Sequence, residues 1–157
     1  MRPLPEELCE FIESGVSILV GSRDAELRPA GVRGFGARVG NDRTTLTVHL
    51  PDVNSGRVIA NVRENGLIAV TFSRPIDHRA IQVKGTAIAV RGSNDEDRRT
   101  QEQYRAAFME QVYAVGMPRA VMRRVVYWPS TAVEFVVEGL FIQTPGPSAG
   151  KSLIPPP

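Results

Sequence analysis

Cysteine and histidine are scarce in this sequence of 157 residues, and long apolar runs are absent. The lone cysteine, Cys9, excludes an internal disulfide framework and any zinc site built from several cysteines. The two histidines, His49 and His78, do not have the i, i+4 spacing of a ligand pair, so we predict no metal site. No segment has the apolar length of a signal peptide or a membrane span, which predicts a cytoplasmic protein with no membrane partner.

A strong excess of one charge is also missing. The sequence contains nineteen basic and seventeen acidic residues, and no Lys/Arg tract is interleaved with aromatic residues. We therefore predict no nucleic-acid partner. The sequence has no G-x-S-x-G elbow, no cysteine with a histidine partner and no carboxylate pair that spacing would bring together. We therefore assign no catalytic side chain, and if the protein is an enzyme its reactive atom belongs to a cofactor.

The segment "GPSAGKS" near the C-terminus is similar to a phosphate-binding loop but departs from it at three points. Only three residues separate Gly146 from Gly150, and Pro145, which lacks an N–H group, stands where the first glycine belongs. The helix that must follow such a loop is replaced by "LIPPP". We divide the chain into one domain, residues 1–143, and a Pro/Gly-rich tail, residues 144–157.

Strand patterns dominate the domain. Leu46, Val48 and Leu50 alternate with polar residues, the two-residue period of a half-buried strand. The long apolar strand that begins near residue 79 changes parity along its length, which predicts a bulge near Gly85 that would reconcile Ile88 with the earlier apolar face. Helical spacing predicts helices over residues 3–15, 57–65 and 95–116. Consecutive strands predict a mainly β (α+β) fold, a small antiparallel barrel of about six strands with three main helices at its periphery.

The segment "NSGRVIANV" is the best candidate anion site. We place Ser55 and Gly56 at the mouth of the short helix, where free N–H groups and the helix dipole attract phosphate, and Arg57 adds a charged donor. The alternative is that Asp52 or Ser55 only caps the helix and that Arg57 is solvated.

Four segments in order, "RPAGVRGFGARV", "LTVHLPDVNSGR", "LIAVTFS" and "HRAIQVKGTA", are similar to the pyridoxamine 5′-phosphate oxidase-like, FMN-binding split barrels. The resemblance covers roughly residues 16–92, and the closing "VEGLFIQTPGPSAG" resembles the end of a short subgroup. It implies an antiparallel split β-barrel, an FMN walled by both subunits of a homodimer, and oxidoreductase activity on a small-molecule substrate.

The resemblance assigns cofactor binding to seven positions: Arg33, Gly34, Phe35, Leu50, Ser55, Arg57 and Gln82. The first three match an arginine-led strand that runs along the flavin, and Leu50 matches the end of the next strand, beside the ring.

The remaining three positions match residues that hold other parts of the cofactor. Ser55 and Arg57 match a Ser-x-Lys that holds the phosphate, with arginine in place of the commoner lysine. Gln82 resembles a glutamine that reaches the cofactor, although it stands two residues later than in the oxidase; the alternative is an ordinary polar residue of an exposed strand.

Three functions stay open on the sequence alone. The first is an FMN-dependent oxidoreductase, the second a non-catalytic protein that binds FMN, haem or a related cofactor, and the third a barrel dimer with no cofactor. The sequence lacks the Trp and Arg-rich closing segment with which the true oxidase holds its substrate's phosphate. We therefore do not expect a true pyridoxamine 5′-phosphate oxidase.

Overall fold

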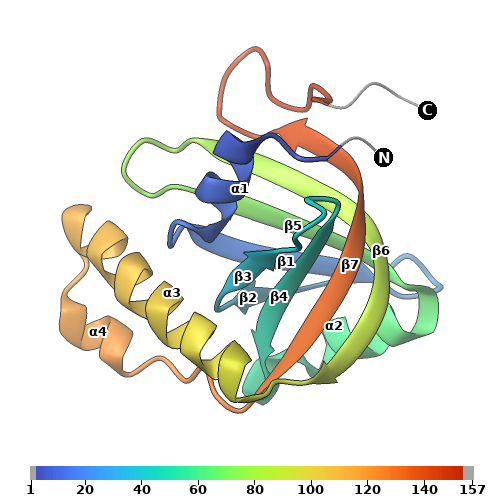
Figure 1. Cartoon of the computed structure of the whole chain (residues 1–157), viewed down its shortest axis with the longest axis horizontal. Coiled ribbons are helices and arrows are strands. Elements are labelled where there is room, and N and C mark those ends of the chain that lie inside the picture. Colours follow the sequence, from blue (N-terminus) through green and yellow to red (C-terminus); the bar gives the residue numbers. More distant parts are fainter. Residues whose placement is uncertain (1–2, 154–157) are drawn as a thin grey trace.

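The computed structural model describes residues 3–153 and contains one sheet of seven antiparallel strands with four helices around it (Figure 1). The strands are β1 (Ser17–Arg23), β2 (Pro29–Gly34), β3 (Ala37–Val39), β4 (Thr45–Pro51), β5 (Leu67–Ser73), β6 (Ala80–Gly92) and β7 (Ser130–Ile142). The helices are α1 (Glu6–Glu13), α2 (Asp52–Asn65), α3 (Asp95–Ala114) and α4 (Arg119–Arg123).

The strand order is β2-β1-β5-β6-β7-β4-β3, so the sheet ends in β2 and β3 and does not close on itself. The mainly β prediction is confirmed, but the estimate of six strands is wrong. Residues 30–40 do not form one continuous strand, because the chain breaks there into β2 and β3 at opposite edges of the sheet. Gly36 makes the break possible because its φ of 112° lies in a region that other residues rarely adopt. The three predicted helices are joined by a fourth, the short α4, which was not predicted.

Helix α2 begins earlier than the sequence predicts. Its first residue is Asp52, after the extended Pro51, and not a residue near Arg57. The polar and glycine-containing "DVNSG" has low helix propensity, but Val58, Ile59 and Val62 bury one face of the helix, and tertiary packing outweighs that propensity. Ser55 and Gly56 consequently lie inside the first turns of α2 and not at its mouth.

Strand β6 bends as predicted. Its pairing with β7 shifts register between Lys84 and Gly85, where a Cβ would stand 1.9 Å from a carbonyl oxygen of β7, so this position requires glycine. A second irregularity lies between Ala87 and Ala89. Ile88 is the extra residue there and is 57% exposed, so the expectation that it rejoins the core face is wrong.

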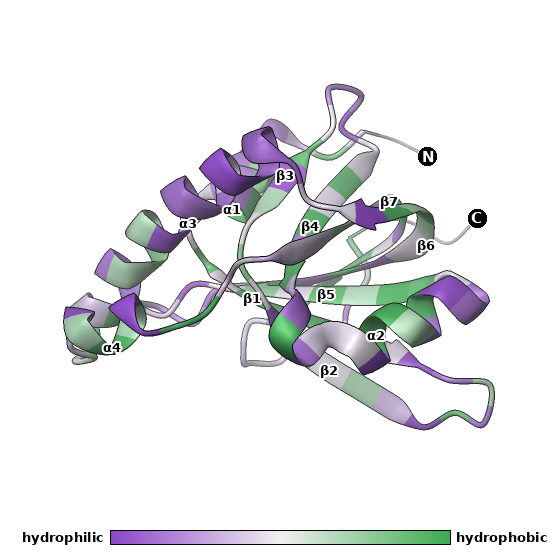
Figure 2. Ribbon diagram, turned by 90° about the horizontal axis from the view of Figure 1, so that it is seen from below, coloured by the Kyte–Doolittle hydropathy of each residue, from purple (hydrophilic) through white to green (hydrophobic). Residues whose placement is uncertain are grey.

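Helix α3 begins as its sequence predicts. Asn94 accepts a hydrogen bond from the Asp97 backbone N–H (2.9 Å), and the Asp97 carboxylate accepts one from the Asn94 N–H (2.9 Å), which together form a capping box. Tyr104, Phe108 and Val112 face the core from this helix. Figure 2 shows many hydrophilic residues along α3 and hydrophobic segments along the strands.

The core lies on one face of the curved sheet. Ile18, Val20, Val70, Phe72 and Val83 are fully buried on that face, so the alternate residues of β1, β5 and β6 point outward. Beyond β7, the tail returns along the end of that strand. The Leu153 N–H donates to the Leu140 carbonyl (2.7 Å) and the Gly150 N–H to the Ile142 carbonyl (2.7 Å).

Candidate functional site

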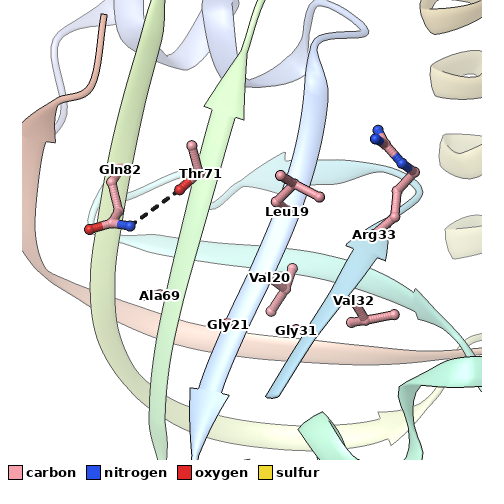
Figure 3. Close-up of a pocket in the computed structure, with 9 residues that line it drawn as sticks. All are labelled: Leu19, Val20, Gly21, Gly31, Val32, Arg33, Ala69, Thr71 and Gln82. Carbon is pink, nitrogen blue, oxygen red and sulfur yellow. Dashed lines mark hydrogen bonds between the residues drawn. The ribbon is translucent and has the colours of Figure 1, made fainter. Parts of the chain in front are cut away.

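Four neighbouring strands bring one row of outward side chains together. In the register of the sheet, Leu19 of β1 stands opposite Arg33 of β2 on one side and Thr71 of β5 on the other, and Thr71 stands opposite Gln82 of β6. These residues border an open pocket of about 430 Å³ on the outer face of the sheet. Figure 3 shows Arg33 at one side of this pocket, the Thr71–Gln82 pair at the other and Leu19 between them.

Arg33 presents a charged group that the protein leaves largely unpaired. Its Nη1 donates to Ser17 Oγ (2.9 Å), and its guanidinium carbon stands 5.5 Å from the centre of the Phe108 ring on α3. Within residues 3–153 it forms no ion pair with a carboxylate. Because a guanidinium carries five N–H donors, most of them remain available to an anion in the pocket.

Thr71 and Gln82 form the polar side of the pocket. Gln82 Nε2 donates to Thr71 Oγ1 (3.2 Å), which fixes the two half-buried side chains against each other. The contact also leaves the amide oxygen of Gln82 as an acceptor without a protein donor among the described residues. Gln82 is therefore a lining residue of the pocket and not an isolated exposed polar residue of a strand.

The pocket contains no acidic side chain. Of the nine residues that line it, only Arg33 is charged. A concave surface with one unpaired cation and no carboxylate attracts anionic ligands. It offers hydrogen bonds and a charge, but no group that could act as a nucleophile or as a general acid or base near neutral pH.

Three of the predicted site residues point away from this pocket. Phe35 and Leu50 are buried in the core, and the Phe35 ring packs edge-on against Tyr104 with ring centroids 6.2 Å apart. Gly34 faces the core as well, because a Cβ there would stand 2.7 Å from the Ile18 side chain. The structure brings together Arg33 and Gln82 at the pocket, and Gly34, Phe35 and Leu50 do not line it.

Ser55 and Arg57 lie on α2, which packs against β1 and β2. Ser55 is fully buried, and its hydroxyl has no hydrogen-bond partner within residues 3–153. Arg57 is exposed and makes no hydrogen bond or ion pair with the described part of the chain. Residues two apart on a helix point to different sides, so the two side chains do not converge on one point.

Leu19, Gly21, Gly31, Ala69 and Thr71 line the pocket but are absent from the sequence prediction. Their parity was visible, since each alternates with a buried neighbour along its strand. The strand pairing was not visible, because the order β2-β1-β5-β6 depends on contacts distant in sequence. Alternation along each strand could predict that these residues point outward. Only the pairing of the strands shows that they are neighbours in one pocket.

Reactive groups elsewhere are held in inactive states. Burial raises the pKa of the Cys9 thiol, so it is protonated at neutral pH and a poor nucleophile. Burial also raises the pKa of Tyr104, whose hydroxyl donates to the Val16 carbonyl (2.8 Å). No cluster of three or more His, Cys, Asp or Glu residues suited to a metal ion occurs within residues 3–153, and no helix in that range is long and apolar enough to cross a membrane.

Comparisons with known proteins identify the fold. No protein-family model and no curated protein sequence matches the chain. Among solved structures, HupZ from Group A Streptococcus is 20% identical, with 94% of this chain and 99% of that chain covered and a TM-score of 0.56. A pyridoxamine 5′-phosphate oxidase-related, FMN-binding protein from Nostoc punctiforme is 10% identical, with 99% and 98% covered and a TM-score of 0.53.

A third similar structure is described as an F420 reductase; it is 11% identical, with 87% of this chain and 98% of that chain covered and a TM-score of 0.54. At these identities the similarity establishes the fold. The chain therefore has the fold of the pyridoxamine 5′-phosphate oxidase-like, FMN-binding split barrels, and the expectation of that fold is confirmed. Proteins of this fold do not share one activity, so function must be argued from the site.

Proposed function

We propose that the protein is an FMN-dependent oxidoreductase that acts on a small organic substrate. The observation that supports this proposal is the pocket on the outer face of β2, β1, β5 and β6, which no acidic side chain lines. Arg33 lies at one end of this pocket and the Thr71–Gln82 pair at the other. The fold is one that FMN-binding proteins use, and the pocket offers the charge and polar groups that an anionic, planar cofactor requires.

The residues present fit FMN. Its phosphate requires cationic donors, and Arg33 and Arg57 have no carboxylate partner within residues 3–153. Ser55 contributes a buried hydroxyl with no partner, a group that normally finds a hydrogen bond. We assign Arg33 and Gln82 to the cofactor in the pocket. The resemblance proposes Ser55 and Arg57 for its phosphate, and of these two only the exposed Arg57 is open to a ligand from solvent.

Haem fits the pocket less well. Haem iron is held by a His, Cys, Met or Tyr side chain, and none of the nine lining residues is of these types. His49 is buried in the protein, and His78 lies in the turn between β5 and β6. A flavin therefore fits the described surface better than a haem does.

The side chains of the pocket bind and orient, and the bound flavin would supply the electron exchange. Arg33 holds negative charge, and the paired Thr71 and Gln82 offer fixed hydrogen-bonding groups to a polar edge. We propose a nicotinamide or oxygen as the second redox partner.

We also propose that the protein is a cytoplasmic homodimer. The pocket on the outer face of β2, β1, β5 and β6, called the outer shelf below, is open to solvent. Leu19, which borders it, is 49% exposed. A second copy would cover this surface and exclude water from the ligand. Light scattering at micromolar concentration should give the mass of two chains, and the mass of a single chain would contradict the dimer.

The function is tested by the visible spectrum of the purified protein and by titration with FMN. We expect flavin absorption bands, or saturable binding of one FMN per chain, and reduction of the bound flavin by NADH or NADPH. A Soret band would support the haem-binding alternative. A colourless protein that binds no added FMN would contradict the proposal and support the barrel dimer with no cofactor.

A further inference from the structure

A strip of bare backbone crosses three strands at the bottom of the pocket. Gly31 of β2, Gly21 of β1 and Ala69 of β5 stand opposite one another in the register and face outward. Two of the three have no side chain, and the third has only a methyl group. Peptide groups of adjacent strands are therefore open to a ligand along this row (Figure 3).

The fold does not require glycine at either position. Neither Gly21 nor Gly31 has a positive φ, and an added Cβ would meet no atom closer than 3.8 Å at Gly21 and 3.7 Å at Gly31, which are ordinary contacts. Gly34 and Gly85 differ, since a Cβ would stand 2.7 Å and 1.9 Å from its nearest neighbour. Glycine weakens a strand interior and, where packing does not demand it, marks close approach of a ligand or of another backbone.

Apolar and charged groups border the strip. Leu19 and Leu67 lie two residues from it along β1 and β5 and are 49% and 37% exposed. Lys84 stands opposite Ala69 on β6, and its ammonium lies 5.0 Å from the centre of the Phe141 ring. The strip thus has an apolar side chain on each side, Leu19 and Leu67, and a cation, Lys84, at its β6 end.

We propose that this strip is the surface on which a planar heteroaromatic ring of the flavin class lies flat. The inference rests on the proposed function and deepens it by naming the residues under the ring. Strands are about 4.8 Å apart, so the distance from Gly31 to Ala69 is about 10 Å, comparable with the length of a fused three-ring system. Bare peptide groups allow such a ring to approach to stacking distance, and the leucines cover its edges.

Glycine-to-alanine variants test the inference because they separate ligand binding from stability. The double variant Gly21→Ala/Gly31→Ala should weaken FMN binding at least tenfold in a fluorescence titration, while its melting temperature equals or exceeds that of the wild type. Gly92→Ala is the matched control, since Gly92 also lies in a strand and its Cβ would meet nothing within 4 Å. It should bind FMN as the wild type does.

The outcomes distinguish the inference from the proposed function. Wild-type FMN affinity in the double variant would overturn the inference and leave the flavin proposal standing. A change in light-scattering mass with unchanged FMN affinity would overturn it in favour of contact with a second copy. No FMN binding by the wild type itself would overturn both. A tenfold or greater loss confined to the double variant, with unchanged mass, would support the inference.

Discussion

Two polar regions of the molecule differ in how their side chains are satisfied. At the start of α3, charged and amide groups bond mainly to one another and to the backbone. On the outer shelf of β2, β1, β5 and β6, Arg33 and Gln82 keep donors and acceptors that no described residue uses. The first arrangement stabilises the fold, whereas the half-exposed Arg33 and Gln82, which water can satisfy in the free protein, keep donors and acceptors available to a ligand.

The polar cluster at the start of α3 shows this satisfaction in detail. Asp97 accepts hydrogen bonds from Arg91 and from the Asn94 N–H. Gln101 is fully buried, donates to the Tyr127 carbonyl (3.3 Å) and accepts from Ser130 Oγ (2.9 Å). These bonds join α3 to β6, to β7 and to the segment before β7. Beside them, the buried His49 keeps one ring nitrogen, Nδ1, with no hydrogen-bond partner within residues 3–153.

The largest expected effect comes from the cluster. Asp97→Ala removes a capping box and an ion pair in a largely buried position and should lower the free energy of unfolding by about 2–4 kcal/mol. Urea unfolding measures this change. Asp95→Ala, at an exposed position in the same first turn, should cost about 0.5 kcal/mol or less. The FMN affinity of folded Asp97→Ala should equal that of the wild type. A tenfold loss of affinity would contradict the separation between a cluster that stabilises the fold and a surface that binds the ligand.

A pH dependence should also come from the cluster. Burial lowers the pKa of His49 from 6.5 to about 4, although Asp97 opposes this shift, so the folded state prefers the neutral imidazole. The unfolded chain binds more protons between pH 6.5 and pH 4, and stability should therefore fall as the pH drops through this window, by up to about 3 kcal/mol from this residue. His49→Gln should flatten the profile in this window. An unchanged slope would show that other groups cause the acid sensitivity.

Arg33→Ala should weaken FMN binding and leave stability almost unchanged, the opposite of what Asp97→Ala should do. The loss of a charge-assisted hydrogen bond to an anion predicts FMN binding weaker by about 1.5–3 kcal/mol, roughly a ten- to 150-fold increase in Kd. The free energy of unfolding should change by less than about 1 kcal/mol, because Arg33 bonds only Ser17 Oγ within the described residues. Arg33→Lys should retain part of the affinity. Equal FMN affinity in all three proteins would remove Arg33 from the site.

Arg57→Ala should produce the smallest effect. Its guanidinium is exposed and solvated in the free protein, so we expect a loss of FMN affinity near the lower end of the range for charged donors, about 1.5 kcal/mol. Arg63→Ala, exposed on the same helix, is the control and should bind FMN normally. If both variants match the wild type in a flavin titration, Arg57 is a solvated surface residue.

Local patterns in the sequence predicted the parts of the fold that depend on local rules. The alternation in β4, the start of α3 at residue 95 and the bulge near Gly85 each follow from neighbouring residues, and the structure contains all three. The break at Gly36 and the early start of α2 were missed, because packing against distant residues determines them.

The candidate site was predicted in part. Arg33 and Gln82 were identified by resemblance and share the pocket. Gly21, Gly31 and Thr71 join them only through strand pairing between segments up to some fifty residues apart, and no local signal carries that information. Phe35 was placed beside the cofactor by its neighbour in sequence, but alternation along the chain turns its side chain into the core.

Amide hydrogen exchange with and without FMN tests most directly that the ligand binds the outer shelf. Saturating FMN should slow exchange in residues 17–34 and 67–84, which contain the strands of the shelf, and should leave exchange in residues 94–114 unchanged. Protection confined to residues 94–114, or no protection at saturating FMN, would contradict the assignment of the shelf as the flavin site.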